Sequence, residues 1–209
     1  MNVIGFDDGP FPAEHRGSVL LVGAVCSGTR LDGVVSGRIR RDGADATRRI
    51  VELVQQSQFR EHVGAILLQG IAVGGFNVVD VHALREALDV GVLVVTRRRP
   101  DLAAVERALF SDTPPRRPRV RGARRKWRLI QAAGAIELLE PSRRALGRSA
   151  ASGLPASGQR LWVQRAGLSL EQARALVAAT TLHGHLPEPL RLAHLIAGGI
   201  ATGKSRGRA

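Results

Sequence analysis

The order of apolar and polar positions along the chain predicts a block of strands followed by alternating helices and strands. Three β-rich segments open the sequence, and glycines and charged residues separate them as hairpin connections do. These segments are residues 1–6, 19–26 and 32–40. From Asp45 the apolar positions recur with helical spacing, and either Asp42 or Asp45 is suited to cap the start of that helix.

The middle of the chain predicts a β-α-β unit. Residues 63–68 form a continuous apolar run, which is typical of a strand covered on both faces. A glycine-rich loop at 70–75 leads to a helix over 78–88 and a strand over 91–96, and helical spacing returns after Pro100. The pattern therefore predicts an α/β fold with a mixed sheet, in which antiparallel strands 1–3 precede parallel strands and helices flank the sheet.

The rest of the sequence is less regular, and we expect it to complete a single domain over residues 1–209. A segment rich in Pro and Arg at 111–126 is expected to be an exposed basic loop, and 147–159 a second loop. Ser169 and Gln172 have the spacing of a helix capping box. The remaining expected elements are strands at 135–139 and 161–163 and helices at 169–181 and 188–200.

Charge is distributed unevenly between the two halves of the chain. Residues 1–96 hold 9 Lys and Arg against 11 Asp and Glu, whereas residues 97–209 hold 22 against 7. The basic half accounts for the formal net charge of +13 and favours a polyanionic partner, above all nucleic acid. The alternative is a GC-rich coding bias, because arginine and alanine greatly outnumber lysine.

Cysteine and apolar content limit the other classes of protein. Cys26 is the only cysteine, so the chain forms no internal disulfide and no multi-cysteine zinc site. No apolar run approaches the roughly 18–20 residues that span a bilayer, and the acidic N-terminus is unlike a signal peptide. We therefore expect a cytoplasmic protein with no membrane partner.

Acidic residues lie where a sheet could bring them together at a metal ion. Asp7 closes the first strand, Asp42 precedes the first helix, and position 69 follows the strand at 63–68. Two-metal cleavage of a phosphodiester needs several carboxylates around metal ions about 4 Å apart. The alternative is structural, because Asp8-Gly9 and Asp42-Gly43 are also ordinary turn pairs.

Three longer motifs make the sequence similar to a known family. The chain resembles the endonuclease V superfamily, which has a ribonuclease H-like fold, and it looks closest to the endonuclease dU-like branch. The resemblance covers nearly the whole chain. Its motifs are Ile4-Gly5-Phe6-Asp7-Asp8-Gly9-Pro10-Phe11, Gly70-Ile71 with Gly75-Phe76-Asn77-Val78-Val79-Asp80, and Pro187–His194 with residues 203–209.

The resemblance implies a metal site that lacks one acid. A strand-borne Gly-x-Asp supplies the first ligand in the nuclease relatives, which matches Asp7, and a second acid before the first long helix matches Asp42. The third acid of the relatives belongs to an Asp-Gly pair, and this sequence has Gln69-Gly70 there. Glutamine offers a neutral carbonyl oxygen only, so the implied Mg2+ or Mn2+ site is weakened.

Other departures from endonuclease V also bear on activity. The histidine before its penultimate helix corresponds to Ala166, and its strand-separating wedge includes a tyrosine, which this chain lacks. The acid that usually closes the Pro-Glu-Pro helix motif is His194 here. We interpret His194 first as a buried histidine with a satisfied hydrogen bond and second as a site residue. Recognition of deaminated purines is therefore not implied.

Two further acids could compensate for Gln69. Asp8 follows Asp7, but it points to the opposite face if the strand continues. Asp80 lies early in the helix after the glycine-rich loop, where it could reach back to the site. The structural alternative for Asp80 is that it stabilises the N-terminus of that helix.

Two basic clusters are candidates for contact with nucleic acid. Arg97 and Arg98 follow the strand at 91–96, on the side where open α/β sheets bind ligands. The second cluster combines basic residues with an aromatic ring that could stack on bases. It consists of Arg124, Arg125, Lys126 and Trp127. The alternatives are a solvated loop and a buried tryptophan that anchors it.

Two hypotheses of different classes follow. The first is a metal-dependent nuclease or nuclease-like protein acting on DNA or RNA, with nucleic-acid repair as one setting. In it Asp7, Asp42 and Asp8 bind metal, and Gln69 and Asp80 assist. The second is a nucleic-acid-binding protein that keeps the fold without catalysis, which Gln69 favours. The sequence leaves enzymatic activity and oligomeric state open.

Overall fold

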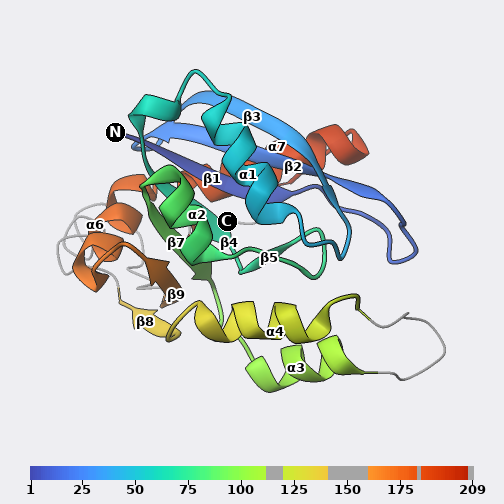
Figure 1. The fold of residues 1–209 in the computed structure, drawn as a ribbon. Coiled ribbons are helices and arrows are strands. Elements are labelled where there is room, and N and C mark those ends of the chain that lie inside the picture. Colours follow the sequence, from blue (N-terminus) through green and yellow to red (C-terminus); the bar gives the residue numbers. More distant parts are fainter. Residues whose placement is uncertain (112–119, 141–159, 183–184, 207–209) are drawn as a thin grey trace.

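A seven-stranded mixed sheet forms the centre of the computed structural model, with helices on both faces (Figure 1). The structure describes residues 1–111, 120–140, 160–182 and 185–206. The order of the strands across the sheet is β3-β2-β1-β4-β7-β9-β8. Their bounds are β1 (Asn2–Asp8), β2 (Ser18–Ser27), β3 (Arg30–Arg40), β4 (Val63–Gln69), β7 (Gly91–Thr96), β8 (Glu137–Leu139) and β9 (Leu161–Ala166).

Strand directions confirm the predicted fold class. β1, β2 and β3 form an antiparallel meander, and β4 and β7 then add to the other side of β1 in parallel. β9 and β8 close the sheet as antiparallel strands. The helices are α1 (Ala46–Gln55), η1 (Arg60–His62), α2 (Val81–Leu88), α3 (Leu102–Phe110), α4 (Ala123–Ala132), α6 (Leu170–Thr180) and α7 (Glu188–Thr202).

Alternation along the strands divides the core into two layers. In β1, Ile4 and Phe6 belong to an apolar cluster with α1 and α2. Val3 points the other way, into a cluster with α6 and α7 that also includes Leu67 of β4. A third cluster joins α3 and α4 to a small hairpin of β5 (Ala72–Val73) and β6 (Asn77–Val78). Each face of β1 therefore packs against different helices.

Helix α7 lies directly on β1. A Cβ atom at Gly5 would come within 2.4 Å of the Pro189 carbonyl carbon, and one at Gly9 within 3.2 Å of the Ala201 side chain. A helical turn rises about 5.4 Å and two strand residues about 6.6 Å, so alternate residues of β1 meet successive turns of α7. Glycine at these positions lets the helix approach closely enough for residue 7 to meet its central turn.

Several element boundaries differ from the sequence prediction. The helix expected over 78–88 begins at Val81, because Asn77–Val78 pairs with β5. Residues 123–126, expected in an exposed loop, belong to α4, and Lys126 is buried. Residues 112–119 of that loop lie outside the described residues, as do 147–159.

Asn77 caps α1 from outside the helix. Asp45 occupies the N-cap position as predicted, but its side chain makes no capping bond. The Asn77 Oδ1 atom instead accepts a hydrogen bond from the Ala46 amide at 3.0 Å. Its Nδ2 donates to Asp45 Oδ1 and to the Arg40 carbonyl. The predicted capping box of Ser169 is confirmed at the start of α6.

Among the described residues, no helix is both long and apolar enough to cross a membrane.

Replacing Gly5 by alanine tests the contact between β1 and α7. The new methyl group meets the backbone of Pro189, which cannot rotate away, so we expect a loss of about 2–3 kcal/mol in the free energy of unfolding. Urea denaturation measures it. Gly199→Ala is the control in α7, because only the Ser205 hydroxyl lies near, at 3.8 Å. If Gly5→Ala unfolds at the same urea concentration as the wild type, the close packing of β1 against α7 is contradicted.

Replacing Asn77 by alanine tests the cap on α1. The change removes the acceptor for the buried Ala46 amide, whereas the Arg40 carbonyl still accepts from the Gly43 amide. We expect the free energy of unfolding to fall by about 1–3 kcal/mol, because a buried donor is left without its acceptor. Gln56→Ala, at the exposed end of α1, should change it little in the same urea titration.

Candidate active site

The strand ends place Asp7 beside Gln69. β1 and β4 are parallel neighbours, with Gly5 opposite Leu67 and Phe6 opposite Leu68. The next position in this register brings Asp7 opposite Gln69, on strands about 4.8 Å apart. Leu67 belongs to the core layer under α6 and α7, so alternation directs Gln69 to that same face. The same alternation directs Asp7 toward α7.

His194 of α7 completes this group. Its Nδ1 atom lies 2.8 Å from Asp7 Oδ2. The Asp7 side chain is 13% exposed and the His194 side chain 53%, so the aspartate is the inner member of the pair. The prediction of a buried core histidine is therefore wrong. His194 instead has a hydrogen bond to Asp7 and keeps about half of its side chain open to solvent.

Two buried polar groups of the site, the Asp7 carboxyl and the Gln69 amide oxygen, have fewer polar partners than burial normally requires. Burial raises the pKa of the Asp7 carboxyl, and the hydrogen bond to His194 opposes this shift. The Gln69 Oε1 atom is buried and has no hydrogen-bond partner among the described residues. A buried acceptor without a donor is uncommon in folded proteins and costs free energy. Both groups would gain from a cation or a donor placed between them.

These residues suit a divalent cation only in part. Asp7 offers one carboxylate and Gln69 one neutral amide oxygen. Mg2+ is normally held by more negative oxygen ligands, whereas Mn2+ is found with carboxylate and also accepts imidazole nitrogen. Among the residues that the structure describes, no group of three or more His, Cys, Asp and Glu is placed to hold a metal ion. The described donors therefore fit Mg2+ or Mn2+ in type, because they are oxygen atoms, but they carry less negative charge than magnesium sites usually do.

Asp8 points to the opposite face of the sheet, as its position in the strand predicts. Its carboxyl accepts a hydrogen bond from the backbone of Gly74. Burial, followed by repulsion from Asp7, raises its pKa to about 6. Asp8 therefore binds the loop between β5 and β6, and a role as a metal ligand stays a prediction.

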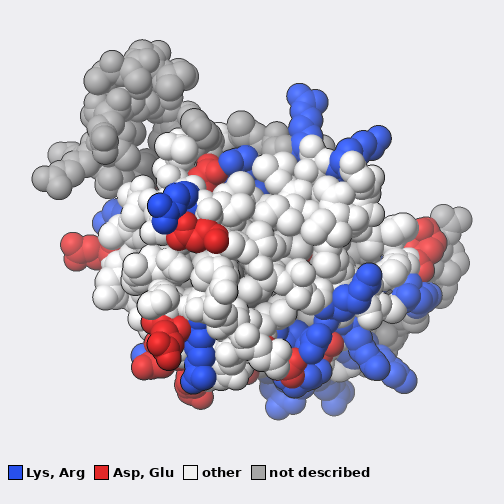
Figure 2. All heavy atoms as spheres, turned by 90° about the horizontal axis from the view of Figure 1, so that it is seen from above, with Lys and Arg blue, Asp and Glu red and all other residues white. Residues whose placement is uncertain are grey.

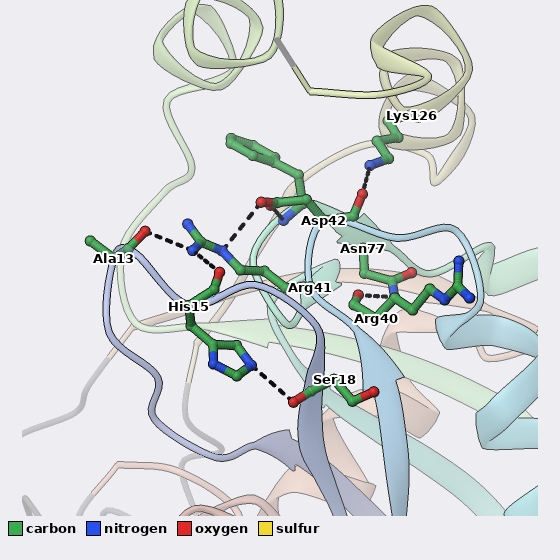
Figure 3. Close-up of polar contacts among 9 residues, drawn as sticks. Ala13, His15, Ser18, Arg40, Arg41, Asp42, Asn77 and Lys126 are labelled. Carbon is green, nitrogen blue, oxygen red and sulfur yellow. Dashed lines mark hydrogen bonds and ion pairs between the residues drawn. The ribbon is translucent and has the colours of Figure 1, made fainter. Parts of the chain in front are cut away.

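Asp42 forms hydrogen bonds with the same loop (Figure 3). Its φ angle is 50°, in the left-handed region that aspartate tolerates better than most residues other than glycine. The Asp42 amide donates to the Gly74 carbonyl, and its Oδ1 accepts from the Phe76 amide at 2.8 Å. Lys126 Nζ donates to the Asp42 carbonyl oxygen at 2.5 Å. The structure thus gives Asp42 loop contacts, and its metal role also stays a prediction.

Arg41 extends this network to the connection between β1 and β2. Its Nη1 atom donates to the carbonyl oxygens of Ala13 and His15, and its Nε lies 3.3 Å from Asp42 Oδ2 (Figure 3). The guanidinium also lies over the Phe11 ring at 5.3 Å. The loop between β1 and β2 is therefore fixed by contacts with Arg41, which directly follows β3.

Asp80 caps α2. Its Oδ1 atom accepts a hydrogen bond from the Ala83 amide at 3.0 Å. Its own amide donates to the Thr47 hydroxyl. The structural alternative that the sequence raised for Asp80 accounts for these contacts, and a role in catalysis stays a prediction.

The basic residues named from the sequence divide into exposed and buried members. Arg97 and Arg98 are exposed directly after β7, and Arg124 and Arg125 are exposed on α4. Lys126 is 2% exposed, so it cannot contact a ligand in this conformation. Figure 2 shows a broad face with few charges at its centre and Lys and Arg around its rim, most densely at the lower right.

Trp127 is half buried rather than displayed to solvent. Its side chain packs in the apolar cluster of α3, α4 and the β5–β6 hairpin, together with Ile130 and Leu109. Burial of Lys126 lowers its pKa, and the nearby charge of Asp42 opposes that shift. Both side chains therefore lie on the side of α4 that packs against the rest of the protein.

Comparisons with known proteins agree with this fold. The family model described as "Endonuclease dU" matches residues 1–201. A UPF0215 protein of Deinococcus radiodurans is 46% identical over 99% of this chain and 92% of its own length. The crystal structure of a protein of unknown function from Archaeoglobus fulgidus superposes with a TM-score of 0.77 at 30% identity, covering 97% of this chain and 99% of the other.

Endonuclease V shares the fold at much lower identity. The Ciona intestinalis enzyme, solved in complex with DNA containing an inosine followed by a ribo-adenosine, superposes with a TM-score of 0.55. It is 14% identical, and the match covers 92% of this chain and 82% of that one. At this identity the likeness shows a common fold.

The pH dependence of stability tests the environment of Asp8. Its pKa of about 6 exceeds the ordinary value of 3.8, so the folded chain holds this proton more tightly than the unfolded chain. The resulting stabilisation is complete below about pH 4 and is lost as the pH rises through about 6. Asp8→Asn stays neutral and keeps an acceptor for Gly74. We expect it to exceed the wild type at pH 8 by on the order of 1–2 kcal/mol.

The measurement is the free energy of unfolding between pH 4 and pH 8 in the presence of EDTA. The difference between variant and wild type should shrink toward zero at pH 4. A difference that is the same at both ends of the range would contradict the raised pKa of Asp8.

Proposed function

Because this chain belongs to the endonuclease dU family, we propose that it is a metal-dependent nuclease acting on DNA or RNA, with Asp7, Gln69 and His194 at the reaction centre. The observation that carries the proposal is the 2.8 Å contact between His194 and Asp7 beside the unpartnered Gln69 Oε1 atom. Family membership and the endonuclease V fold support the coarser statement, a nuclease acting on nucleic acid. A role in nucleic-acid repair is part of the proposal.

Each residue has a distinct part in the proposed chemistry. Asp7 and Gln69 would hold Mg2+ or Mn2+, which when bound would activate water and stabilise charge on the phosphate. His194 orients the Asp7 carboxylate through its Nδ1 atom. The His194 side chain is half exposed, and in the proposal its other ring nitrogen exchanges a proton with water or substrate.

The substrate class rests on similarity and charge. The Ciona structure holds endonuclease V with inosine-containing DNA, and we carry over only the nucleic acid. The chain lacks tyrosine, and Ala166 stands in place of the relatives' histidine, so the inosine preference is not part of the proposal. The formal net charge of +13 suits a polyanionic substrate.

One observation favours a second candidate function, a nucleic-acid-binding protein without catalysis. Gln69 removes a negative charge from the site, and the side chains of Asp42 and Asp80 are engaged in loop and helix contacts. A site with a single carboxylate would bind Mg2+ weakly. The two candidates differ in whether bound nucleic acid is cut.

Substitutions at positions 7 and 69 separate the two candidates. We expect Asp7→Asn to lower cleavage by at least about 100-fold, because it removes the charge that holds the cation. We expect Gln69→Glu to lower the Mg2+ or Mn2+ concentration needed for half-maximal cleavage by about tenfold, since it adds a carboxylate opposite Asp7. The assay follows labelled inosine-containing, uracil-containing and unmodified strands of DNA and RNA.

Binding to the same strands in EDTA provides the control. Unchanged binding with lost cleavage in Asp7→Asn supports a catalytic role. Binding without cleavage by the wild type, by Asp7→Asn and by Gln69→Glu would favour the second candidate. If Asp7→Asn still cleaves at the wild-type rate, the proposed reaction centre at Asp7 is wrong.

A further inference from the structure

Helix α4 displays arginines on one side only. Arg124, Arg125 and Arg128 are exposed, and Arg121 is exposed just before the helix begins. At about 100° per residue, the three helical positions and the extension of Arg121 fall within an arc of about 100°. We call these four residues the arginine face. The buried residues Ala123, Lys126 and Ile130 lie on the opposite side.

No acidic residue near the arginine face in the sequence balances its positive charge. Residues 120–132 include no Asp or Glu. Within the described part of the chain, none of the four arginines forms an ion pair, whereas Arg48, Arg49, Arg165 and Arg191 each have a carboxylate partner. Four unpaired guanidinium groups on one surface produce a positive potential that attracts a polyanion.

The other side of α4 is held firmly against the body of the protein. Lys126 donates to the Asp42 carbonyl oxygen, and Ile130 packs with Val78 of β6 and Leu109 of α3. Figure 3 shows the Lys126 side chain pointing down from α4 to Asp42. The arginine face is therefore presented by a fixed helix, so binding a partner requires ordering of the arginine side chains but not of the backbone that carries them.

The helix also lies near the candidate active site. Ile71 packs against the same apolar cluster as Ile130, and it is two residues after Gln69. Two extended residues span at most about 7 Å, so the cluster on which α4 rests includes a residue whose backbone lies within about 7 Å of the Gln69 backbone. Figure 1 shows α4 running below the β5 hairpin, and α4 contacts β6 of that hairpin.

We propose that the arginine face of α4 binds the phosphate backbone of nucleic acid and holds the strand at the site of Asp7 and Gln69. Guanidinium groups bind phosphate oxygens in a bidentate manner, and a row of them on a helix requires no particular base sequence. This inference rests on the proposed function. It assigns Lys126 and Trp127 to anchoring α4 rather than to contacting the ligand.

An anionic membrane is a less suitable partner for this helix. Helices that lie in a lipid interface place large apolar side chains beside their basic residues. The exposed large apolar residues among the described positions lie elsewhere. They are Met1, Leu31, Val34, Leu102, Leu182 and Ile200.

The test compares two variants that lose the same number of positive charges. One changes Arg124, Arg125 and Arg128 to glutamine, and the control changes the exposed Arg30, Arg48 and Arg60, on the β3, α1 and η1 side, to glutamine. Fluorescence anisotropy measures binding of a labelled single strand by the full chain in EDTA over a range of salt concentrations. Circular dichroism confirms that both variants fold.

We expect the α4 variant to bind at least tenfold more weakly than the wild type. Each lost phosphate contact lowers the slope of log K against log salt by about 0.7 for a single strand, so we expect a decrease of about 2. The control should keep most of the wild-type slope. A further variant with lysine at the three α4 positions should restore most of the slope, because the charge is retained.

Three outcomes would overturn the inference. The α4 variant could bind like the wild type, both variants could weaken binding equally, or the wild type could bind anionic vesicles in preference to the strand. These outcomes are independent of cleavage, because the measurement excludes metal. Wild-type binding through α4 without cleavage in Mg2+ or Mn2+ would refute the nuclease and leave the arginine face standing.

Discussion

The close contact between α7 and β1 is the constraint on which the candidate site depends. Residue 5 has no side chain, so the backbone of Pro189 rests directly on the strand. Because two strand residues advance about as far as one helical turn, this contact fixes His194 opposite Asp7. The pair joins positions 187 residues apart in the sequence, and its geometry follows from the packing of two rigid elements.

Local sequence patterns predicted most of the fold but only part of the site. The antiparallel first three strands and the parallel strands after them follow from short-range alternation and from the β-α-β spacing, and the capping box at Ser169 needs only four residues. The role of Asn77 could not be predicted, because it caps a helix 31 residues earlier in the chain. The burial of Lys126 could not be predicted either, because its partner Asp42 lies 84 residues earlier in the chain. A run of basic residues resembles a loop, and only the hydrogen bond to Asp42 shows which member is turned inward.

The carboxylates illustrate the same limit in physical terms. Their sequence positions predicted that several acids gather at one end of the sheet, and the structure places Asp7 beside Gln69 there. Adjacent residues of a strand point to opposite faces, however, so Asp8 binds Gly74 on the other side. Asp42 binds Phe76 in the loop that follows β5. The acids thus divide between holding that loop and forming the site, a division that spacing alone does not reveal.

The loop between β5 and β6 links the two parts of the molecule that the proposals concern. It begins after β5, which ends four residues beyond Gln69, it is held by Asp8 and Asp42, and α4 packs on its hairpin. Any change in the charge of Asp8 alters a contact of this loop, because its carboxyl binds the Gly74 backbone. The loop is therefore held from both sides, by Asp8 and Asp42 at the acidic end of the sheet and by the packing of α4 on its hairpin.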